Sequence, residues 1–178
     1  MPELIVPSPA VKDSFWTAVE EYAAAGMGES PSTFSAIEIV WLYRELGAGD
    51  RLFEQHLARM EAEAAGDRPL RTYWWVEDGE FIGRLTLRLG LPMGERLKGG
   101  DVGYDVRPSR RGEGHATAML STCLVLARRE GLEELYVNCE PSNKASRSVI
   151  RRNGGETVKL PHPRGRTEDG YLCHRIGL

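Results

Sequence analysis

Residues 103–117 read Gly-Tyr-Asp-Val-Arg-Pro-Ser-Arg-Arg-Gly-Glu-Gly-His-Ala-Thr, and this segment carries the strongest structural signal in the sequence. The alternating apolar residues of 101–106 predict a strand, and the apolar spacing of 112–131 predicts a helix. A strand that passes through a glycine turn into a helix leaves the first N–H groups of that helix without internal acceptors. Gly112 and Gly114 would let an anion approach these groups closely, so we expect a phosphate-binding turn.

Two common phosphate-binding motifs do not fit this turn. A P-loop requires a Lys directly after its last glycine, whereas His115 follows Gly114. A dinucleotide-binding motif requires a third glycine where the chain has Thr117, and only about 60 residues remain for the rest of such a domain. The nucleotide class therefore has to come from other residues.

The segment Arg111-Gly-Glu-Gly-His-Ala116 matches the pyrophosphate loop of the GNAT N-acetyltransferases at every defined position. That loop reads Arg or Gln, two residues, Gly, one residue, then Gly or Ala. A second segment, Asn143-Lys-Ala-Ser146, resembles the family's next motif, whose Asn and Ser face the coenzyme arm. The resemblance covers residues 100–155 well and the remainder only by the order of the predicted elements.

This resemblance implies a single α/β domain over residues 1–178 with the GNAT fold, a central mixed and mostly antiparallel sheet flanked by helices. The strands 101–106 and 132–139 would form a splayed parallel pair whose free backbone groups bind the pantetheine amides as a missing strand would. Acetyl-CoA would be the cosubstrate and an amine the acceptor. The resemblance assigns coenzyme binding to Val106, Arg107, Arg111, Gly112, Glu113, Gly114, His115, Ala116, Thr117, Asn143 and Ser146.

The implied reaction is direct attack of the amine on the thioester. An amine with a pKa near 10 is protonated at pH 7, so a group must accept its proton. Asp101 opens the predicted strand, at a position where many relatives carry an acidic residue; it is the candidate base, or else a carboxylate that caps Gly99-Gly100. Glu140 could hold or deprotonate the acceptor amine, or simply form a turn before Pro141.

The proton donor for the leaving thiolate is the main departure from the family pattern. Many members carry a Tyr seven residues after the motif Asn, where this chain has Ile150. Ser146, Tyr104 or solvent could serve instead, and a thiolate that leaves readily needs no acid. Tyr104 could also be a core aromatic, and Asn143 a helix N-cap. The missing Tyr keeps a second function open, that of a non-catalytic acyl-CoA-binding or sensor module.

Composition and charge exclude several other classes of protein. The 178 residues carry 23 Lys or Arg and 26 Asp or Glu, and 41% are hydrophobic. No apolar run is long enough for a membrane span and no secretory signal opens the chain, so we expect a cytoplasmic protein without a membrane partner, as a monomer or homodimer. A net charge of −3 argues against nucleic acid. The three cysteines should be reduced, and no His or Cys spacing suggests a metal site.

Charge differs between the two parts of the chain. Residues 1–70 hold 5 Lys or Arg against 12 Asp or Glu, and residues 71–178 hold 18 against 14. We interpret this as a cationic acceptor for the first part and an anionic ligand for the second, although two solvated faces would look the same. The expected acceptor-side acids are Glu20, Glu21, Glu38 and Glu45. The basic residues expected around the 3′-phosphorylated ADP of the coenzyme are Arg107, Arg110, Arg111, Arg147, Arg151 and Arg152.

The remaining elements follow from apolar periodicity and from turn residues. We expect helices around 11–22, 37–41, 53–60 and 143–153, a hairpin of 72–76 with 81–89, a loop over 90–100, and strands at 132–139, 156–159 and 171–176. Trp74 and Trp75, adjacent on one strand, should face opposite sides of the sheet. Either ring could line an acceptor pocket, but we favour a role in core packing.

Overall fold

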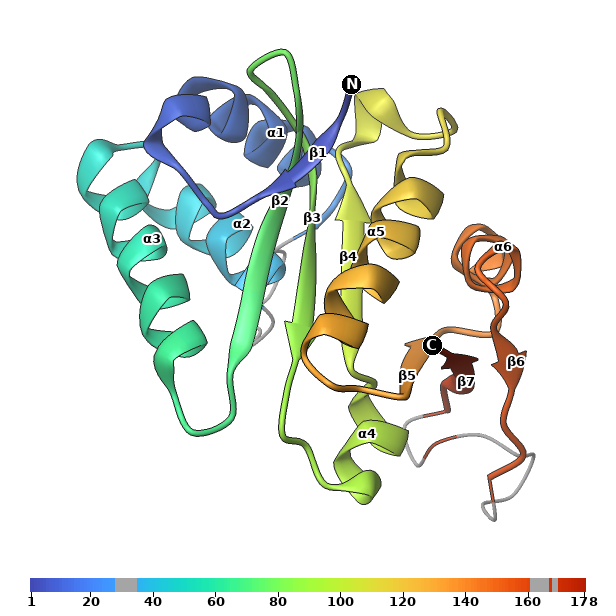
Figure 1. Ribbon diagram of the computed structural model, residues 1–178. Coiled ribbons are helices and arrows are strands. Elements are labelled where there is room, and N and C mark those ends of the chain that lie inside the picture. The colour runs from blue at the N-terminus through green and yellow to red at the C-terminus, as the bar shows by residue number, and fades with distance from the viewer. Residues whose placement is uncertain (28–34, 161–166, 168–169) are drawn as a thin grey trace.

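A computed structural model describes residues 1–27, 35–160, 167 and 170–178 of the chain. Its strands form two antiparallel sheets. The first sheet has the order β1 (Glu3–Ile5), β2 (Leu70–Glu77), β3 (Glu80–Arg88), β4 (Val102–Val106). The second has the order β5 (Glu134–Cys139), β7 (Leu172–Gly177), β6 (Glu156–Thr157). Figure 1 shows the first sheet at the centre, with α5 beside β4 and the second sheet beyond it.

The helices confirm most of the expected periodicity. The described helices are α1 (Lys12–Ala24), α2 (Ser35–Leu46), α3 (Asp50–Ala65), α4 (Met93–Gly99), α5 (His115–Arg129) and α6 (Lys144–Arg152). The loop expected over 90–100 is wrong, because this stretch contains α4. Pro92 occupies the N-cap position of α4, and Gly100, with φ +72°, follows its last residue. The residues that suggested a loop are therefore the two ends of a short helix.

The strands β4 and β5, expected to form a splayed parallel pair, are in contact but share no ladder. Every pairing among the described strands is antiparallel, and no ladder joins β4 to β5. A single backbone hydrogen bond connects them near their starts, from the N–H of Asp101 to the carbonyl oxygen of Tyr136 at 2.7 Å. The described strands therefore form two antiparallel ladders that meet at β4 and β5, and the parallel pairing itself stays a prediction.

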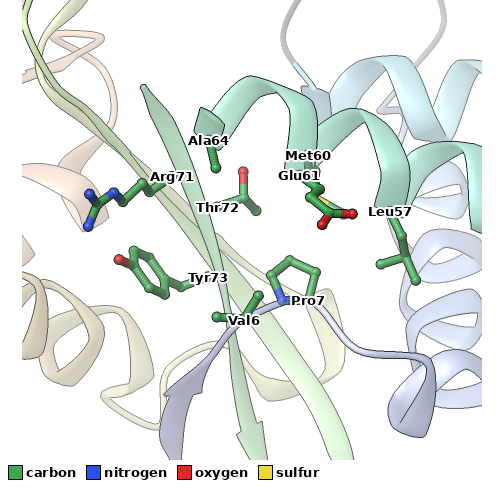
Figure 2. Close-up of a pocket in the computed structure, with 9 residues that line it drawn as sticks. All are labelled: Val6, Pro7, Leu57, Met60, Glu61, Ala64, Arg71, Thr72 and Tyr73. Atoms are coloured by element: carbon green, nitrogen blue, oxygen red, sulfur yellow. The ribbon is translucent and has the colours of Figure 1, made fainter. Parts of the chain in front are cut away.

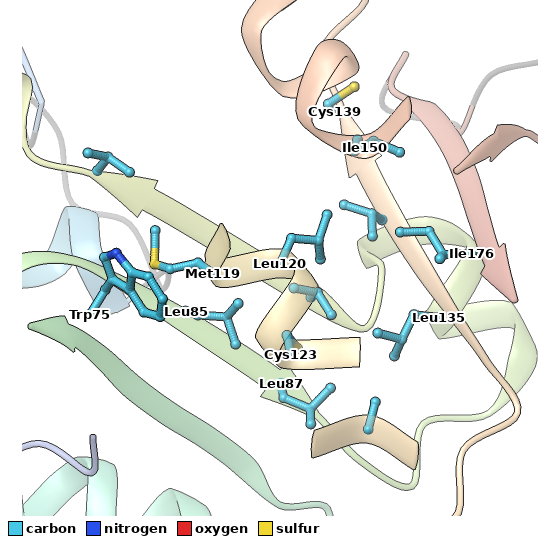
Figure 3. Packing of buried hydrophobic residues seen from close by; sticks show 14 of the residues in the cluster. Trp75, Leu85, Leu87, Met119, Leu120, Cys123, Leu135, Cys139, Ile150 and Ile176 are labelled. Atoms are coloured by element: carbon cyan, nitrogen blue, oxygen red, sulfur yellow. The ribbon is translucent and has the colours of Figure 1, made fainter. Parts of the chain in front are cut away.

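The two faces of the first sheet bury separate cores, as the adjacent tryptophans predicted. Trp74 packs with Phe15, Phe53 and other residues of α1–α3, and its ring stacks on that of Phe15 at 4.8 Å. Trp75 packs on the opposite face with residues of α5, such as Met119. Figure 3 shows that this second core continues across both sheets, with Leu135, Ile150 and Ile176 beside the side chains of β3 and α5. Apolar packing therefore joins the two sheets where backbone pairing does not.

The hairpin of β2 and β3 turns at Asp78 and Gly79, both with positive φ, which suits a tight two-residue turn. The three cysteines are free and buried. No helix in the described part of the chain has both the length and the apolar character that crossing a bilayer requires.

Gly83 provides a test of the β3–β4 contact. A Cβ at this position would lie 2.3 Å from the carbonyl oxygen of Asp105, and backbone cannot move aside cheaply. We expect Gly83→Ala to lower the free energy of unfolding by about 1–3 kcal/mol, measured by chemical denaturation. Gly94→Ala is the matched control, because nothing lies within 4 Å of its added Cβ and alanine favours the helix. Equal stability of the two variants would contradict the packing described here.

Candidate active site

A cleft of about 590 Å³ lies where β4 ends and α5 begins, with α6 forming its other wall. The sequence-predicted residues that line it are Tyr104, Val106, Arg111, Gly112, Gly114, His115, Ala116, Thr117, Asn143 and Ser146. Four predicted site residues, Asp101, Arg107, Glu113 and Glu140, are not among its lining residues. The two motifs therefore meet at one cleft although about 30 residues separate them in the chain.

The glycine turn has the backbone conformation that its sequence requires. Gly112 has φ +85° and Gly114 has φ +90°, values that side-chain-bearing residues rarely adopt. A Cβ built on either glycine meets nothing within 4 Å, so both glycines border open space. Gly114 is the N-cap residue of α5 and has no side chain to satisfy the helix start.

The N–H groups at this turn are free to bind an anion. The N–H groups of Thr117 and Ala118 donate to the carbonyl of Gly114, at 3.0 and 3.1 Å. For the N–H groups of 112–116, the described part of the chain provides no acceptor. Free N–H groups at the positive end of a helix dipole form an anion site, and their number here suits a diphosphate.

The arginines around the turn are not equivalent. Arg110 is surrounded by three carboxylates, those of Glu77, Glu80 and Glu113, so its charge is compensated. Arg111 donates from Nε to the carbonyl of Val106 at 3.1 Å and has no carboxylate partner among the described residues. Arg152 lines the cleft from α6 and is likewise without an ion pair in the described chain. Arg111 and Arg152 are therefore the cations that an anionic ligand in the cleft would meet.

The expected binding role of Arg107 is not supported by its position. Its guanidinium is buried and bonds to Glu21 of α1, to Glu80 and to the carbonyl of Phe81. Burial alone would raise the pKa of Glu21, but hydrogen bonds from Arg107 and Ser109 hold it below its usual value. This pairing fixes the chain before the turn against α1 and leaves no guanidinium for the coenzyme.

His115 turns its side chain away from the free N–H groups. Its Nδ1 accepts a hydrogen bond from the indole N–H of Trp75 at 3.2 Å, so the ring proton lies on Nε2. Nε2 then donates to the exposed Glu113 at 3.1 Å. His115 and Glu113 therefore brace the turn through their side chains.

The edge of β4 that faces the cleft carries unused backbone groups. Asp105 and Gly103 pair with β3, so the N–H and carbonyl groups of Tyr104 and Val106 point the other way. In the described chain, the N–H groups of these two residues have no acceptor. An added chain, or a developing negative charge, would find donors here.

Tyr104 and Ser146 form a hydroxyl pair inside the cleft. Their oxygens are 2.8 Å apart, and burial raises the pKa of Tyr104 to about 12. Asn143 is the N-cap of α6, because its side-chain oxygen accepts from the N–H of Ser146 at 2.9 Å. Ile150, at the position of the usual family Tyr, is fully buried in the core and faces no ligand.

Asp101 lies deep between the two sheets and is only 2% exposed. Its carboxylate accepts from Arg96, with Nε at 2.9 Å and Nη2 at 2.8 Å, and from the N–H of Tyr136 at 2.8 Å. Both oxygens are thus engaged, and no side of the group is open to an acceptor. The proton transfer expected of Asp101 therefore does not fit its position.

The sequence comparison decides the family. Residues 32–156 match the family described as the acetyltransferase (GNAT) domain, which is well over half of the chain. The chain belongs to the GNAT acetyltransferases. It is accordingly an enzyme that takes its acetyl group from acetyl-CoA, and the expected GNAT fold is confirmed. A search of curated protein sequences finds no match.

Solved structures with the same fold cover nearly the whole chain. RimJ of Mycobacterium smegmatis, in complex with CoA-disulfide, has a TM-score of 0.72 at 21% identity and covers 99% of this chain and 81% of its own. PaiA N-acetyltransferase of Thermoplasma acidophilum, in complex with coenzyme A, has a TM-score of 0.61 at 11% identity, and the match covers 100% of this chain and 99% of PaiA. A Salmonella typhimurium acetyltransferase modifies the N-terminal serine of the 50S ribosomal protein L7/L12. Its structure has a TM-score of 0.60 at 17% identity, and the match covers 98% of this chain and 92% of that enzyme.

The acids expected on the acceptor side of this acetyltransferase are largely occupied. Glu21 holds Arg107, Glu38 pairs with Arg59, and Glu20 accepts from Tyr43 at 3.3 Å. Glu45 is exposed. Glu140 is exposed too and accepts from Ser142 at 3.3 Å, outside the cleft lining.

The sequence did not identify Asp105 as a cleft residue. Its carboxylate accepts from Tyr22 Oη and from Arg84 Nε, both at 2.6 Å. Alternation along β4 could have found it, but its partners come from α1 and β3. Other lining residues missed as such are Ala145, Ser148 and Val149 of α6. In the described residues, no three His, Cys, Asp or Glu side chains are placed to hold a metal.

A second large hollow, of about 510 Å³, lies between β2 and α3. Figure 2 shows Thr72, Ala64 and Leu57 on one side of it and Tyr73 and Arg71 on the other. Its lining includes no glycine and no helix start. It therefore lacks the features that suit a diphosphate, and the cleft beside α5 is the candidate active site.

Gly114 tests the anion-binding turn. We expect Gly114→Ala to weaken CoA binding at least tenfold, because its Cβ would occupy the open space beside the free N–H groups. Gly131→Ala is a close control: Gly131 follows the other end of α5, has φ +80° and also borders open space. Both variants should lose about 1–2 kcal/mol of stability from the strained backbone. CoA affinities are measured by calorimetry. An equal loss of affinity in the two variants would contradict the assignment of the Gly114 turn as the anion-binding site.

Asp101 tests whether the buried carboxylate is structural. We expect Asp101→Asn to cost about 3–5 kcal/mol of unfolding free energy, because the guanidinium of Arg96 would stay buried without its partner. Glu134→Gln, which removes the more exposed partner of Arg96, should cost less than about 1 kcal/mol. The pH profile of the folded Asp101→Asn enzyme should keep its shape. Activity that is lost at pH 7 and recovered at high pH, with stability unchanged, would restore Asp101 as the base.

Proposed function

We propose that this enzyme transfers the acetyl group of acetyl-CoA to a primary amine by direct attack, with the coenzyme bound in the cleft beside α5. The observation that carries the proposal is the row of free N–H groups at residues 112–116, which lies in the cleft next to Arg111. A diphosphate needs several convergent donors and a nearby cation, and this turn supplies both.

The proposed coenzyme contacts follow from the lining of the cleft. The N–H groups from Gly112 to Ala116 would hold the diphosphate, and Arg111 and Arg152 would balance its charge. The free edge of β4 at Tyr104 and Val106 would bind the pantetheine amides. Thr117, Asn143 and Ser146 complete the walls. Arg107, Glu113 and the His115 ring act as supports of the turn in this proposal.

The reaction forms a bond between the amine nitrogen and the thioester carbonyl carbon and breaks the carbon–sulfur bond. Negative charge develops first on the carbonyl oxygen, where the free N–H of Tyr104 or Val106 can stabilise it. The nitrogen, which carries an extra proton after the attack, releases it to water. The sulfur then leaves as a thiolate that can take a proton from the Tyr104–Ser146 pair, which water reprotonates. A Tyr104 pKa of about 12 keeps this hydroxyl protonated, so it serves as a donor at neutral pH.

The acceptor class follows from the groups that the cleft lacks. Asp105 is the carboxylate among the lining residues, and Tyr22 and Arg84 already occupy its oxygens. Without a free base among the described residues of the cleft, a lysine amine with a pKa near 10.4 would react slowly, whereas an α-amino group with a pKa near 8 is partly neutral at pH 7. We therefore propose the N-terminal amine of a polypeptide as the acceptor. The L7/L12 N-terminal serine acetyltransferase among the similar structures supports this choice.

Initial rates with two peptides test the proposal. One peptide has a free N-terminal Ser and no Lys; the other is identical in length, N-acetylated, and contains one Lys. We expect release of CoA thiol with the first peptide to rise with pH and level off near pH 8. The second should be at least tenfold slower at pH 7 and should still be rising at pH 9, because its amine loses its proton later.

Two outcomes would count against the proposal. Faster reaction with the Lys peptide at pH 7 would remove the N-terminal amine as acceptor and require a base that the cleft lining does not provide. Binding of acetyl-CoA without thiol release above the solvent rate, for either peptide and for a panel of small amines, would remove amine acetylation itself.

A further inference from the structure

A hollow of about 240 Å³ lies against a different face of α6 from the coenzyme cleft. It lies between α6 and the sheet of β6 and β7, and Ser148 is shared with the cleft. Its polar lining residues are Lys144, Arg147, Ser148, Arg151, Thr157 and His174. Three of the six carry a positive charge, and none carries a negative one.

Among the described residues, no carboxylate forms an ion pair with these three cations. Arg59, Arg71 and Arg110, on other elements, each contact at least one carboxylate. In the ranges that the structure describes, neither Lys144 nor Arg151 has an ion pair, and the contact of Arg147 is a long one, 3.5 Å, to the carbonyl of Pro141. Three like charges thus border one small concavity.

The position of the charges on α6 makes simple solvation a poor explanation. Lys144 is the first residue of the helix, where the helix dipole disfavours a cation. Lys144 with Arg147 and Arg147 with Arg151 are spaced three and four residues apart, so they repel each other on one face. The dipole explains only Arg151, which lies in the last turn. A bound anion would attract each of the three cations and so offset the repulsion between them.

His174 adds a buried polar group to the same hollow. Its side chain is only 5% exposed, and its Nδ1 lies 3.3 Å from the carbonyl of Val137, to which it must donate. Nε2 of the neutral ring is then an acceptor with no partner among the described residues, in a ring that lines the hollow. It can bond only to an oxyanion that carries a proton. Thr157 lies directly opposite His174 in the β6–β7 pairing and brings a hydroxyl to the same place.

We propose that this hollow binds a small oxyanion of the phosphate class, held by Lys144, Arg147 and Arg151 with the Ser148 and Thr157 hydroxyls as donors. Its size suits one phosphate group with water, and its lining residues include no Phe, Tyr or Trp on which a base could stack. The phosphate would belong to a molecule other than the coenzyme, because the hollow lies on a different face of α6 from the coenzyme cleft.

Calorimetric titration of the full chain with inorganic phosphate tests the site, in chloride buffers of matched ionic strength. The protein is first saturated with dephospho-CoA, which occupies the diphosphate-binding turn. The phosphate binding measured afterwards then takes place elsewhere on the protein. We expect Arg147→Gln to weaken phosphate binding at least tenfold, and Arg129→Gln, an exposed arginine without an ion pair on α5, to change it less than twofold. Running the same comparison without any coenzyme keeps the result independent of the proposed coenzyme site.

The source of the phosphate is decided by replacing dephospho-CoA with CoA. Loss of phosphate binding would identify the 3′-phosphate of the coenzyme as the occupant, and unchanged binding would identify a separate phosphate-bearing molecule. Only the second result supports the proposal, because the first would return Arg147 and Arg151 to the coenzyme role expected from the sequence. Two results would overturn the oxyanion site and leave only a solvated basic face. One is a heat of binding for phosphate no larger than that for chloride, and the other is equal phosphate affinity of Arg147→Gln and Arg129→Gln.

Discussion

The N–H groups at the start of α5 must stay without acceptors while the chain around them is held still, and much of the surrounding structure meets this requirement. Arg107 is fixed to Glu21 and Glu80 just before the turn. His115 is fixed to Trp75 and Glu113 just after it. Because the side chains on both sides are engaged elsewhere, the free groups between them cannot collapse onto a local partner. Pre-organised donors of this kind lose little freedom when an anion binds.

The Asp101 carboxylate has the corresponding role between the two sheets. It joins the start of β4 to β5 through Tyr136 and to α4 through Arg96, whose guanidinium also lies over the Tyr136 ring at 4.9 Å. Beyond this joint no ladder connects the two strands. The backbone donors of Tyr104 and Val106 are available because the sheets are tied at Asp101 and are not paired along the rest of β4.

Local signals in the sequence predicted the parts of the site that depend on local structure. Gly112 and Gly114 require positive φ, and Asn143 is a strong cap, so the turn and the start of α6 could be placed by residue type alone. The roles of Asp101 and Arg107 could not. Their partners, Arg96 and Glu21, lie in a stretch that resembled a loop and in a helix 86 residues away. The sequence around a carboxylate looks the same whether the folded chain leaves that carboxylate free or buries it in an ion pair.

The same limit applies to the hydroxyl in the cleft. Ile150 is fully buried in the core that joins α6 to β5 and α5, so this position secures the helix instead of serving the reaction. The hydroxyl comes from Tyr104, which reaches across from β4 to Ser146 on α6. Since the two partners belong to different elements, their hydrogen bond forms only when α6 is docked. The burial of Ile150 therefore helps to hold Ser146 within reach of Tyr104, so an apolar residue at the position of the usual family tyrosine supports a hydroxyl pair formed by two other residues.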